Sequence, residues 1–180
     1  MKKGINMRKL FRLAREERGS TLVEFAMTTL LLVALLAGVL QWMLAMYAYH
    51  FTTYAAQEGA RFAAVRGYTW SKSKTTNCST SAPPSFTMPY ECTASATDIQ
   101  NYVQSLATGG INSSNVTINT TTSYVWPGTT PDNTTTGCTT NANSQGCMVK
   151  VTVSYTFSFL PFLKSPSLTL GATSENAILQ

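Results

Sequence analysis

The dominant pattern in the chain is an apolar run from Phe25 to Tyr49, in which Gln41 is the only strongly polar residue. A helix needs about 20 apolar residues to cross a bilayer, and the apolar region of a cleaved secretory signal ends at about 15. No small-x-small cleavage site follows the run. The pattern therefore predicts a retained single-span transmembrane helix. Within it, Ala34 and Gly38 form a small-xxx-small pair suited to close helix contact.

Helical periodicity continues beyond the apolar run through residues 52–66, and we expect the helix to end at Gly67. Small residues recur there at three- and four-residue steps and form one narrow face. This small face consists of Ala56, Ala60, Ala63 and Gly67, widened by Ala55 and Gly59. Two interpretations remain open: neighbouring subunits approach each other along it, or the subunit's own exported domain packs on it. Glu58 and Arg61 lie one turn apart and can form an ion pair.

Period-two alternation marks the C-terminal part of the chain. Residues 149–159 predict a half-buried antiparallel strand. Its apolar face carries Val149, Val151, Val153, Tyr155, Phe157 and Phe159. Residues 168–172 alternate again and predict a hairpin partner, residues 116–119 predict a short third strand, and residues 97–107 predict a helix. The expected fold class is α+β: a long N-terminal transmembrane helix that extends into a small exported domain, with a short antiparallel sheet and one helix.

The charge distribution gives the expected orientation. Residues 1–19 hold seven basic and two acidic residues, which accounts for the whole net charge of +5. Positive charge beside a span keeps that end cytoplasmic, so the basic character is a topology signal and we expect no nucleic-acid partner. The leader forms either an amphipathic segment on the membrane surface or an unstructured basic tail. The expected organisation is a leader at 1–19, the helix with its alanine-rich extension at 20–67, and one exported domain at 68–180.

All four cysteines follow the span. Their spacing does not fit paired zinc knuckles, and an even number in an exported Thr- and Ser-rich domain predicts two disulfides. Of the three possible pairings we favour the two local ones, because each closes a loop that has little core of its own. These pairs are Cys78–Cys92 and Cys138–Cys147. Residues 68–96 and 123–146, which contain them, are otherwise rich in turn signals.

Catalytic chemistry has little support in the sequence. The single histidine, His50, lies among aromatic residues at the outer edge of the span. A belt of aromatic residues at the membrane interface accounts for its position. The chain has no nucleophile elbow and no phosphate-binding glycine loop, and its exported acidic residues are scattered. We therefore expect a protein that is not an enzyme, with no catalytic residues, no cofactor and no metal site.

The start of the span carries an unusual acidic residue. Glu24 lies at the mouth of the apolar run, where a carboxylate becomes costly towards the bilayer centre, although the headgroup region tolerates it. Glu24 is the fifth residue after Gly19, which follows the basic leader, and Phe25 is the sixth. This pattern resembles the type IV prepilin processing site in the form found in tight-adherence (Tad) pilins and TadE-like pseudopilins. The Glu-Gly-Ala-Arg segment at 58–61 is similar to a segment found just beyond the span in the TadE family.

The resemblance implies a pilin-like fold and cleavage by a prepilin peptidase between Gly19 and Ser20. It also implies that Glu24 directs assembly, by pairing with the new Ser20 ammonium of a neighbour, and that Phe25 belongs to the recognised motif. The chain would then be a minor pseudopilin with a structural role in assembling or priming a Tad/Flp-type pilus or secretion apparatus. The polar Ser20-Thr21 pair departs from many family members.

The implied partners are the peptidase, other pilins or pseudopilins and the Tad assembly platform of a bacterial inner membrane, with the N terminus cytoplasmic and the C-terminal domain periplasmic or extracellular. The alternative is an uncleaved single-span anchor that displays an adhesion or partner-binding domain. A third class, a soluble secreted binding module, requires removal of the span.

Overall fold

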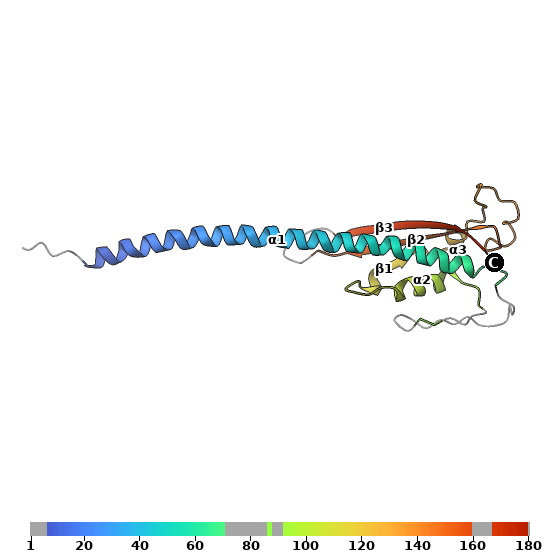
Figure 1. Ribbon diagram of the computed structural model, residues 1–180, viewed down its shortest axis with the longest axis horizontal. Helices are drawn as coiled ribbons and strands as arrows, with labels where there is room; N and C mark the ends of the chain where they lie inside the picture. The colour runs from blue at the N-terminus through green and yellow to red at the C-terminus, as the bar shows by residue number, and fades with distance from the viewer. Residues whose placement is uncertain (1–6, 71–85, 88–91, 160–166, 180) are drawn as a thin grey trace, which may run out of the picture. The chain divides into compact units, whose positions relative to one another are not determined.

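The computed structural model describes residues 7–70, 86–87, 92–159 and 167–179. The described chain is α+β, as the sequence predicts, and consists of one long helix, a small antiparallel sheet and shorter helices (Figure 1). The elements in chain order are α1 (Met7–Val65), α2 (Ala96–Ser105), a 3-10 turn (Ser113–Asn115), β1 (Val116–Ile118), α3 (Thr122–Val125), β2 (Met148–Phe157) and β3 (Leu168–Ala177).

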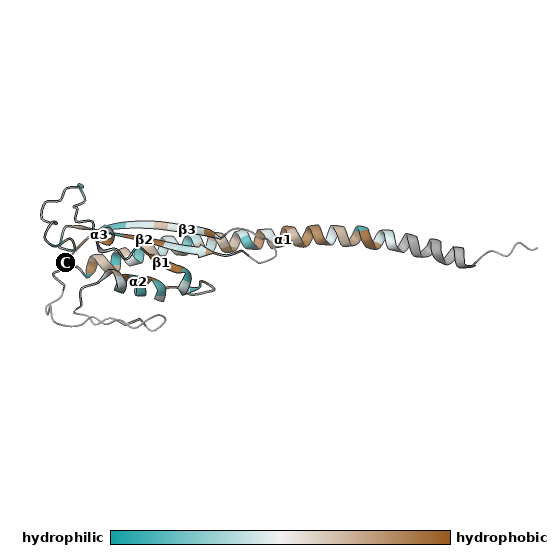
Figure 2. Cartoon of the chain, turned by 180° about the vertical axis from the view of Figure 1, so that it is seen from behind, coloured by the Kyte–Doolittle hydropathy of each residue, from teal (hydrophilic) through white to brown (hydrophobic). Residues whose placement is uncertain are grey.

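The chain divides into two compact units, Met1–Leu44 and Ala45–Gln180, and α1 contributes to both. In the first unit the large apolar side chains of α1 are exposed, including Phe25 at 71% and Leu30 at 72%. Figure 2 shows this stretch coloured predominantly as hydrophobic. Among the described residues, one helix is long and apolar enough to cross a membrane, over Gly19–Val65. An exposed apolar surface of this length is suited to a lipid environment.

The N-terminal end of α1 lies within the leader, for which two interpretations were open, and its C-terminal end differs from the expectation. The helix begins at Met7, so the described part of the basic leader is helical and continuous with the span. It ends at Val65, two residues before Gly67, which is buried and does not have a positive φ angle. A glycine with a positive φ angle is not needed to end the helix, because hydrogen bonds to other segments direct the chain away from α1. The Tyr68 N–H donates to the Asn143 carbonyl oxygen at 2.8 Å.

The sheet has the order β1-β2-β3, and both strand pairs are antiparallel. The predicted hairpin is confirmed, since β2 and β3 pair from Met148 with Ala177 to Phe157 with Leu168. β3 continues five residues beyond the predicted end of its alternating pattern at Ala172. Its polar half is held by cross-strand contacts on the solvent face. These are the Thr152–Thr173 hydroxyl hydrogen bond at 2.7 Å and the Lys150–Glu175 ion pair at 2.9 Å.

The core of the second unit lies between the sheet and the distal part of α1. The buried face of β2 is the predicted one, with Val149, Val151, Val153 and Tyr155 in the core. The small face of α1 is buried against it, and Ala55, Ala60 and Ala63 are fully inaccessible. A Cβ atom placed on Gly59 would lie 2.9 Å from Val103 Cγ2 of α2 and 3.2 Å from Val151 Cγ1 of β2. Of the two interpretations, the structure therefore supports packing on the chain's own domain.

Two local features were not predicted. α2 begins with a capping box, in which the Ser95 hydroxyl accepts from the Asp98 N–H and the Asp98 carboxylate accepts from the Ser95 N–H. α3 occupies the start of the segment predicted as a loop, and it buries Val125 together with the following Trp126. This helix forms for a tertiary reason. Val125 and Trp126 complete the hydrophobic core, and the threonines and glycines of this segment cannot do so alone.

Candidate functional site

The predicted processing site lies in the regular, exposed part of α1. Gly19 and Ser20 are both exposed, and a Cβ atom placed on Gly19 would meet nothing within 4 Å. Packing in this chain therefore does not require a glycine at position 19. The peptide bond between Gly19 and Ser20 is part of a continuous helix, so its carbonyl group is engaged in helical geometry.

Glu24 is exposed one turn after Ser20 on the same helix. The Thr28 hydroxyl donates to the backbone carbonyl oxygens of Glu24 at 3.1 Å and Phe25 at 3.0 Å, which leaves the Glu24 carboxylate out of this contact. Among the side chains that the structure describes, none forms an ion pair with Glu24. The carboxylate therefore remains accessible to a group outside the described chain.

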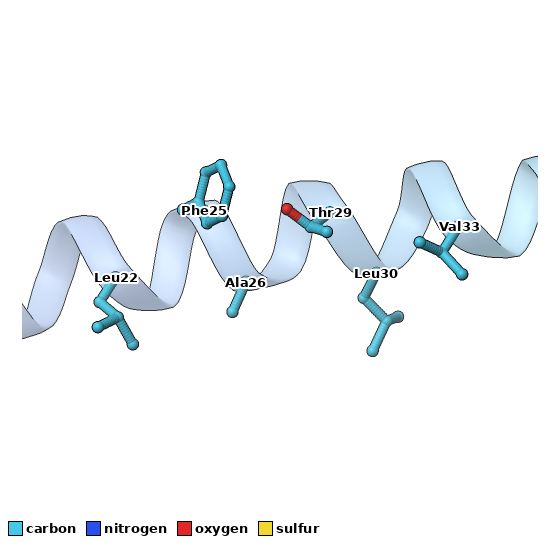
Figure 3. Close-up of a pocket in the computed structure, with 6 residues that line it drawn as sticks. All are labelled: Leu22, Phe25, Ala26, Thr29, Leu30 and Val33. Atoms are coloured by element: carbon cyan, nitrogen blue, oxygen red, sulfur yellow. The ribbon is translucent and has the colours of Figure 1, made fainter.

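The surface around Phe25 is apolar and slightly hollowed. It includes a depression of about 460 Å³ lined by Leu22, Phe25, Ala26, Thr29, Leu30 and Val33. Figure 3 shows these side chains along successive turns of α1. Ala34 and Gly38 lie further along the helix and are exposed, and Gly38 has open space where a Cβ would be. This face of α1 has the uneven, small-and-large relief into which another helix can pack.

The distal part of α1 carries a mixed aromatic and charged cluster that was not predicted. The Phe62 ring stacks on the Tyr102 ring of α2 with centroids 4.4 Å apart, and Phe86 meets both rings edge-on or tilted. The Arg66 guanidinium lies 4.8 Å from the centre of the Phe62 ring. Burial raises the pKa of Tyr102, and the Glu58 carboxylate raises it further. The expected Glu58–Arg61 ion pair is present at 3.1 Å.

The disulfide prediction is confirmed where the structure describes it. Cys138 and Cys147 are bonded and both are buried. Cys92 is also disulfide-bonded, but Cys78 lies outside the described residues, and so does the predicted Cys78–Cys92 pair. The loop closed by Cys138 and Cys147 contains Asn143, and it thereby fixes the chain that leaves α1.

A metal centre was not expected from the sequence. In the described ranges of the chain, no three His, Cys, Asp or Glu side chains gather closely enough to hold a metal ion. The described part of the molecule offers an accessible helix surface near Gly19 and a packed distal domain.

Comparison with known proteins agrees with the motif at the start of the span. The chain matches no curated protein and no solved structure. A family model described as TadE-like protein matches residues 19–61, which include Gly19, Glu24, Phe25 and the Glu58–Arg61 segment. The chain therefore carries a TadE-like segment that begins at the glycine of the predicted processing site and ends in the alanine-rich extension of α1.

Proposed function

We propose that the protein is a minor pseudopilin of a tight-adherence pilus system, processed by a prepilin peptidase and acting structurally in pilus assembly or priming. The observation that carries this proposal is the TadE-like match over residues 19–61, which starts at the glycine of the processing motif. The exposure of Gly19, Ser20 and Glu24 on α1 supports it, because both the peptidase and a neighbouring subunit must reach these residues.

Cleavage after Gly19 removes the whole +5 leader and leaves a new ammonium group on Ser20. In a bundle of such helices, the Glu24 carboxylate of one subunit pairs with the Ser20 ammonium of another. A buried charge without a partner is strongly unfavourable, so this pairing selects one axial register between subunits. The apolar depression beside Phe25 supplies the surface on which the neighbouring helix packs.

Cleavage requires local unwinding of α1, because a peptidase must reach the carbonyl of Gly19 and the helix engages it. Glycine favours this step, since a glycine in a helix is about 1 kcal/mol less stable than an alanine. Because packing does not require Gly19, the processing reaction is a sufficient reason for a glycine there.

The second candidate function is a static single-span anchor that is never cut and displays the distal domain for adhesion or partner binding. The observation that favours it is the continuity of α1 from Met7 through the predicted cleavage site. In both proposals the protein lies in a bacterial inner membrane with its N terminus cytoplasmic and its C-terminal domain exported, and it has no enzymatic activity.

N-terminal sequencing and intact mass of the membrane-extracted protein separate the two proposals. The measurement is made in cells with and without active prepilin peptidase. A start at Ser20 only when the peptidase is active supports the pseudopilin. A start at Met1 in both strains overturns processing and leaves the static anchor.

A further inference from the structure

The apolar run and the core of the second unit overlap at one end of that unit. About 20 residues suffice to cross the hydrocarbon core of a bilayer, so a span that starts at Phe25 is complete near Leu44. The run continues to Tyr49, and the second unit begins at Ala45. Ala48 belongs to this continuation, is 1% exposed and is part of the core. The second unit therefore starts to pack where the span leaves the hydrocarbon.

The loop after α2 is shaped to fit this stretch of α1. The Tyr47 hydroxyl donates to the Thr108 carbonyl oxygen at 3.4 Å. The next residue, Gly109, has a φ angle of +62°, and a Cβ atom placed on it would lie 2.8 Å from the Tyr47 hydroxyl oxygen. Glycine suits both this backbone conformation and this close approach. Thr108, Gly109 and Gly110 are exposed, so the loop presents backbone and small side chains to the surroundings of Tyr47.

The β2–β3 hairpin reaches the same end of the second unit. The start of β2 is linked to Ala64 through the C-terminal residues, and further along the strand Val151 lies against Gly59. β2 therefore runs in the direction opposite to the distal part of α1. At about 3.3 Å per strand residue and about 1.5 Å per helix residue, the end of β2 at Phe157 is level with about residue 46 of α1. Figure 1 shows the loop after α2 and the start of β3 at the same end of this unit.

This end of the second unit, which we call the Tyr47 end, exposes large apolar side chains. The Phe157 and Phe159 rings meet edge-on with centroids 5.1 Å apart, and Leu168, which pairs with Phe157, is 42% exposed. Tyrosine is typical of the membrane–water interface, because its ring favours an apolar environment and its hydroxyl favours water. On α1 three more large side chains are exposed at this level, namely Met46, Tyr47 and Tyr49.

Charged side chains are kept away from the Tyr47 end. Among the described residues that form it, at 45–57, 99–119, 151–159 and 167–174, there is no Asp, Glu, Lys or Arg. A charge is costly where it must enter the lipid, so a surface without charges is suited to lipid contact. The charged residues in the rest of the described second unit are Glu58, Arg61, Arg66, Asp98, Asp132, Lys150 and Glu175.

We propose that the Tyr47 end rests on the outer surface of the bilayer, with the loop after α2 and the end of the β2–β3 hairpin at the lipid interface. Lipid is the occupant because this surface is continuous with the apolar run, through Met46 and Tyr49 on the same helix. The contacts that define the surface all lie inside the second unit, so they hold at any angle between the two units. The proposal rests on the membrane insertion of α1, which the proposed function includes.

The test uses the full chain in phosphatidylcholine nanodiscs that contain nitroxide lipids, with the nitroxide either in the headgroup or deep in the acyl chain. A fluorophore is attached at one residue at a time through a non-natural amino acid, which leaves the disulfides intact. The reporting positions at the Tyr47 end are Thr108 and Leu168, which are exposed. Thr136, exposed in the threonine-rich loop before β2, is the control at the other end, and Met43 in the apolar run reports insertion.

We expect headgroup nitroxides to quench the labels at Thr108 and Leu168 about threefold more strongly than the label at Thr136, and acyl-chain nitroxides to quench the label at Met43. Equal quenching at the three exposed positions, with Met43 quenched, overturns the inference and leaves the anchor in place. An unquenched label at Met43 overturns both. Quenching that disappears when two copies share a disc makes a second copy the occupant, and this result also overturns the inference.

A charge placed at the Tyr47 end tests lipid contact in a second way. Thr169→Glu adds a carboxylate at an exposed position beside Leu168, and we expect it to lower the headgroup quenching at Thr108 about twofold, because a carboxylate resists transfer into the interface. Thr136→Glu adds the same charge at the other end and should leave this quenching unchanged. Equal effects of the two variants overturn the inference. None of these results depends on cleavage after Gly19, so this inference and the processing of the chain fail independently.

Discussion

The backbone N–H of Leu179 donates to the carbonyl oxygen of Ala64 across 2.9 Å, which joins the C-terminal end of the described chain to the end of α1. The neighbouring Ile178 is 2% exposed and belongs to the core, whereas Leu179 is 62% exposed. The C-terminal residues thus fasten the sheet to the helix through one buried side chain and one backbone bond. This junction lies beside the loop closed by the Cys138–Cys147 disulfide.

Truncating the buried side chain of this junction should destabilise the distal unit. Ile178→Ala removes a buried apolar side chain, and we expect it to lower the free energy of unfolding by about 2–4 kcal/mol. Leu179→Ala, the control, keeps the backbone bond to Ala64 and changes an exposed side chain, so its effect should stay below about 0.5 kcal/mol. Urea unfolding of the full chain in detergent micelles, followed by tryptophan fluorescence, measures both. Equal losses in the two variants would contradict the assigned roles.

Gly59 should be the position on the small face that tolerates substitution least. Gly59→Ala gains about 1 kcal/mol in helix propensity, but the overlap with Val103 and Val151 costs about 1–3 kcal/mol, because β-branched side chains do not move easily. We expect a net loss of stability. In a double-mutant cycle, Val103→Ala should relieve part of that loss. Strict additivity of the two changes in urea unfolding would show that the two sites do not share this contact.

The Cys138–Cys147 disulfide should stabilise the region where α1 and β3 end. Replacing both cysteines by serine opens a loop with a sequence separation of 9, and we expect the unfolding free energy to fall by about 2–3 kcal/mol. The double replacement leaves the disulfide of Cys92 intact, whereas a reductant would break that disulfide as well. Thermal unfolding of wild type and variant makes the comparison, and an unchanged midpoint would mean that the loop is held by its other contacts.

Stability should fall at alkaline pH through Tyr102. Its pKa is raised above the ordinary value of 10.0, mainly by burial and then by Glu58, so the folded state disfavours the phenolate. The contribution of Tyr102 to stability is fully present below pH 10. It is lost as the pH rises above that value, because Tyr102 releases its phenolic proton at a lower pH in the unfolded chain than in the folded one. Tyr102→Phe should flatten this part of the stability profile. Urea unfolding between pH 8 and 11 follows it, with Tyr49→Phe, which changes an exposed tyrosine on α1, as the control. Parallel profiles for the wild type and Tyr102→Phe would rule out this contribution.

Glu24 should matter for assembly and not for insertion. Glu24→Gln and Glu24→Leu remove the charge that the proposed function pairs with the Ser20 ammonium, and neither makes the span less apolar. We expect normal membrane fractionation and a loss of pilus assembly, while Glu58→Gln, a carboxylate change on the distal part of α1, leaves assembly unchanged. Wild-type assembly in both Glu24 variants would remove Glu24 from the mechanism.

The features that depend on residues close together in the sequence were predictable. An apolar run of this length forms a span-like helix, and period-two alternation in residues 149–157 sets both the strand and its buried face. The Glu58–Arg61 pair and the Cys138–Cys147 bond are local as well, since one helical turn and one short loop bring these partners together. The TadE-like motif around Gly19 and Glu24 is likewise contiguous in the chain.

Other features depend on partners distant in sequence. The sequence left the small face of α1 open between two interpretations, because glycine and alanine permit any close approach; Val103 and Val151 decide which approach occurs. β3 extends through Thr173 and Glu175, whose polar pattern does not signal a strand, because β2 offers hydrogen bonds and cross-strand partners along its length.

The two edges of the sheet differ, and this difference is likewise a tertiary property. Gln100 and Gln104 close one edge and no described element closes the other, and this depends on where α2 packs. Sequence by itself therefore determined the helix, the hairpin and the local bonds, because these need only neighbouring residues. Tertiary structure decided which surfaces are buried and which are left for partners, because burial depends on what folds back against each face.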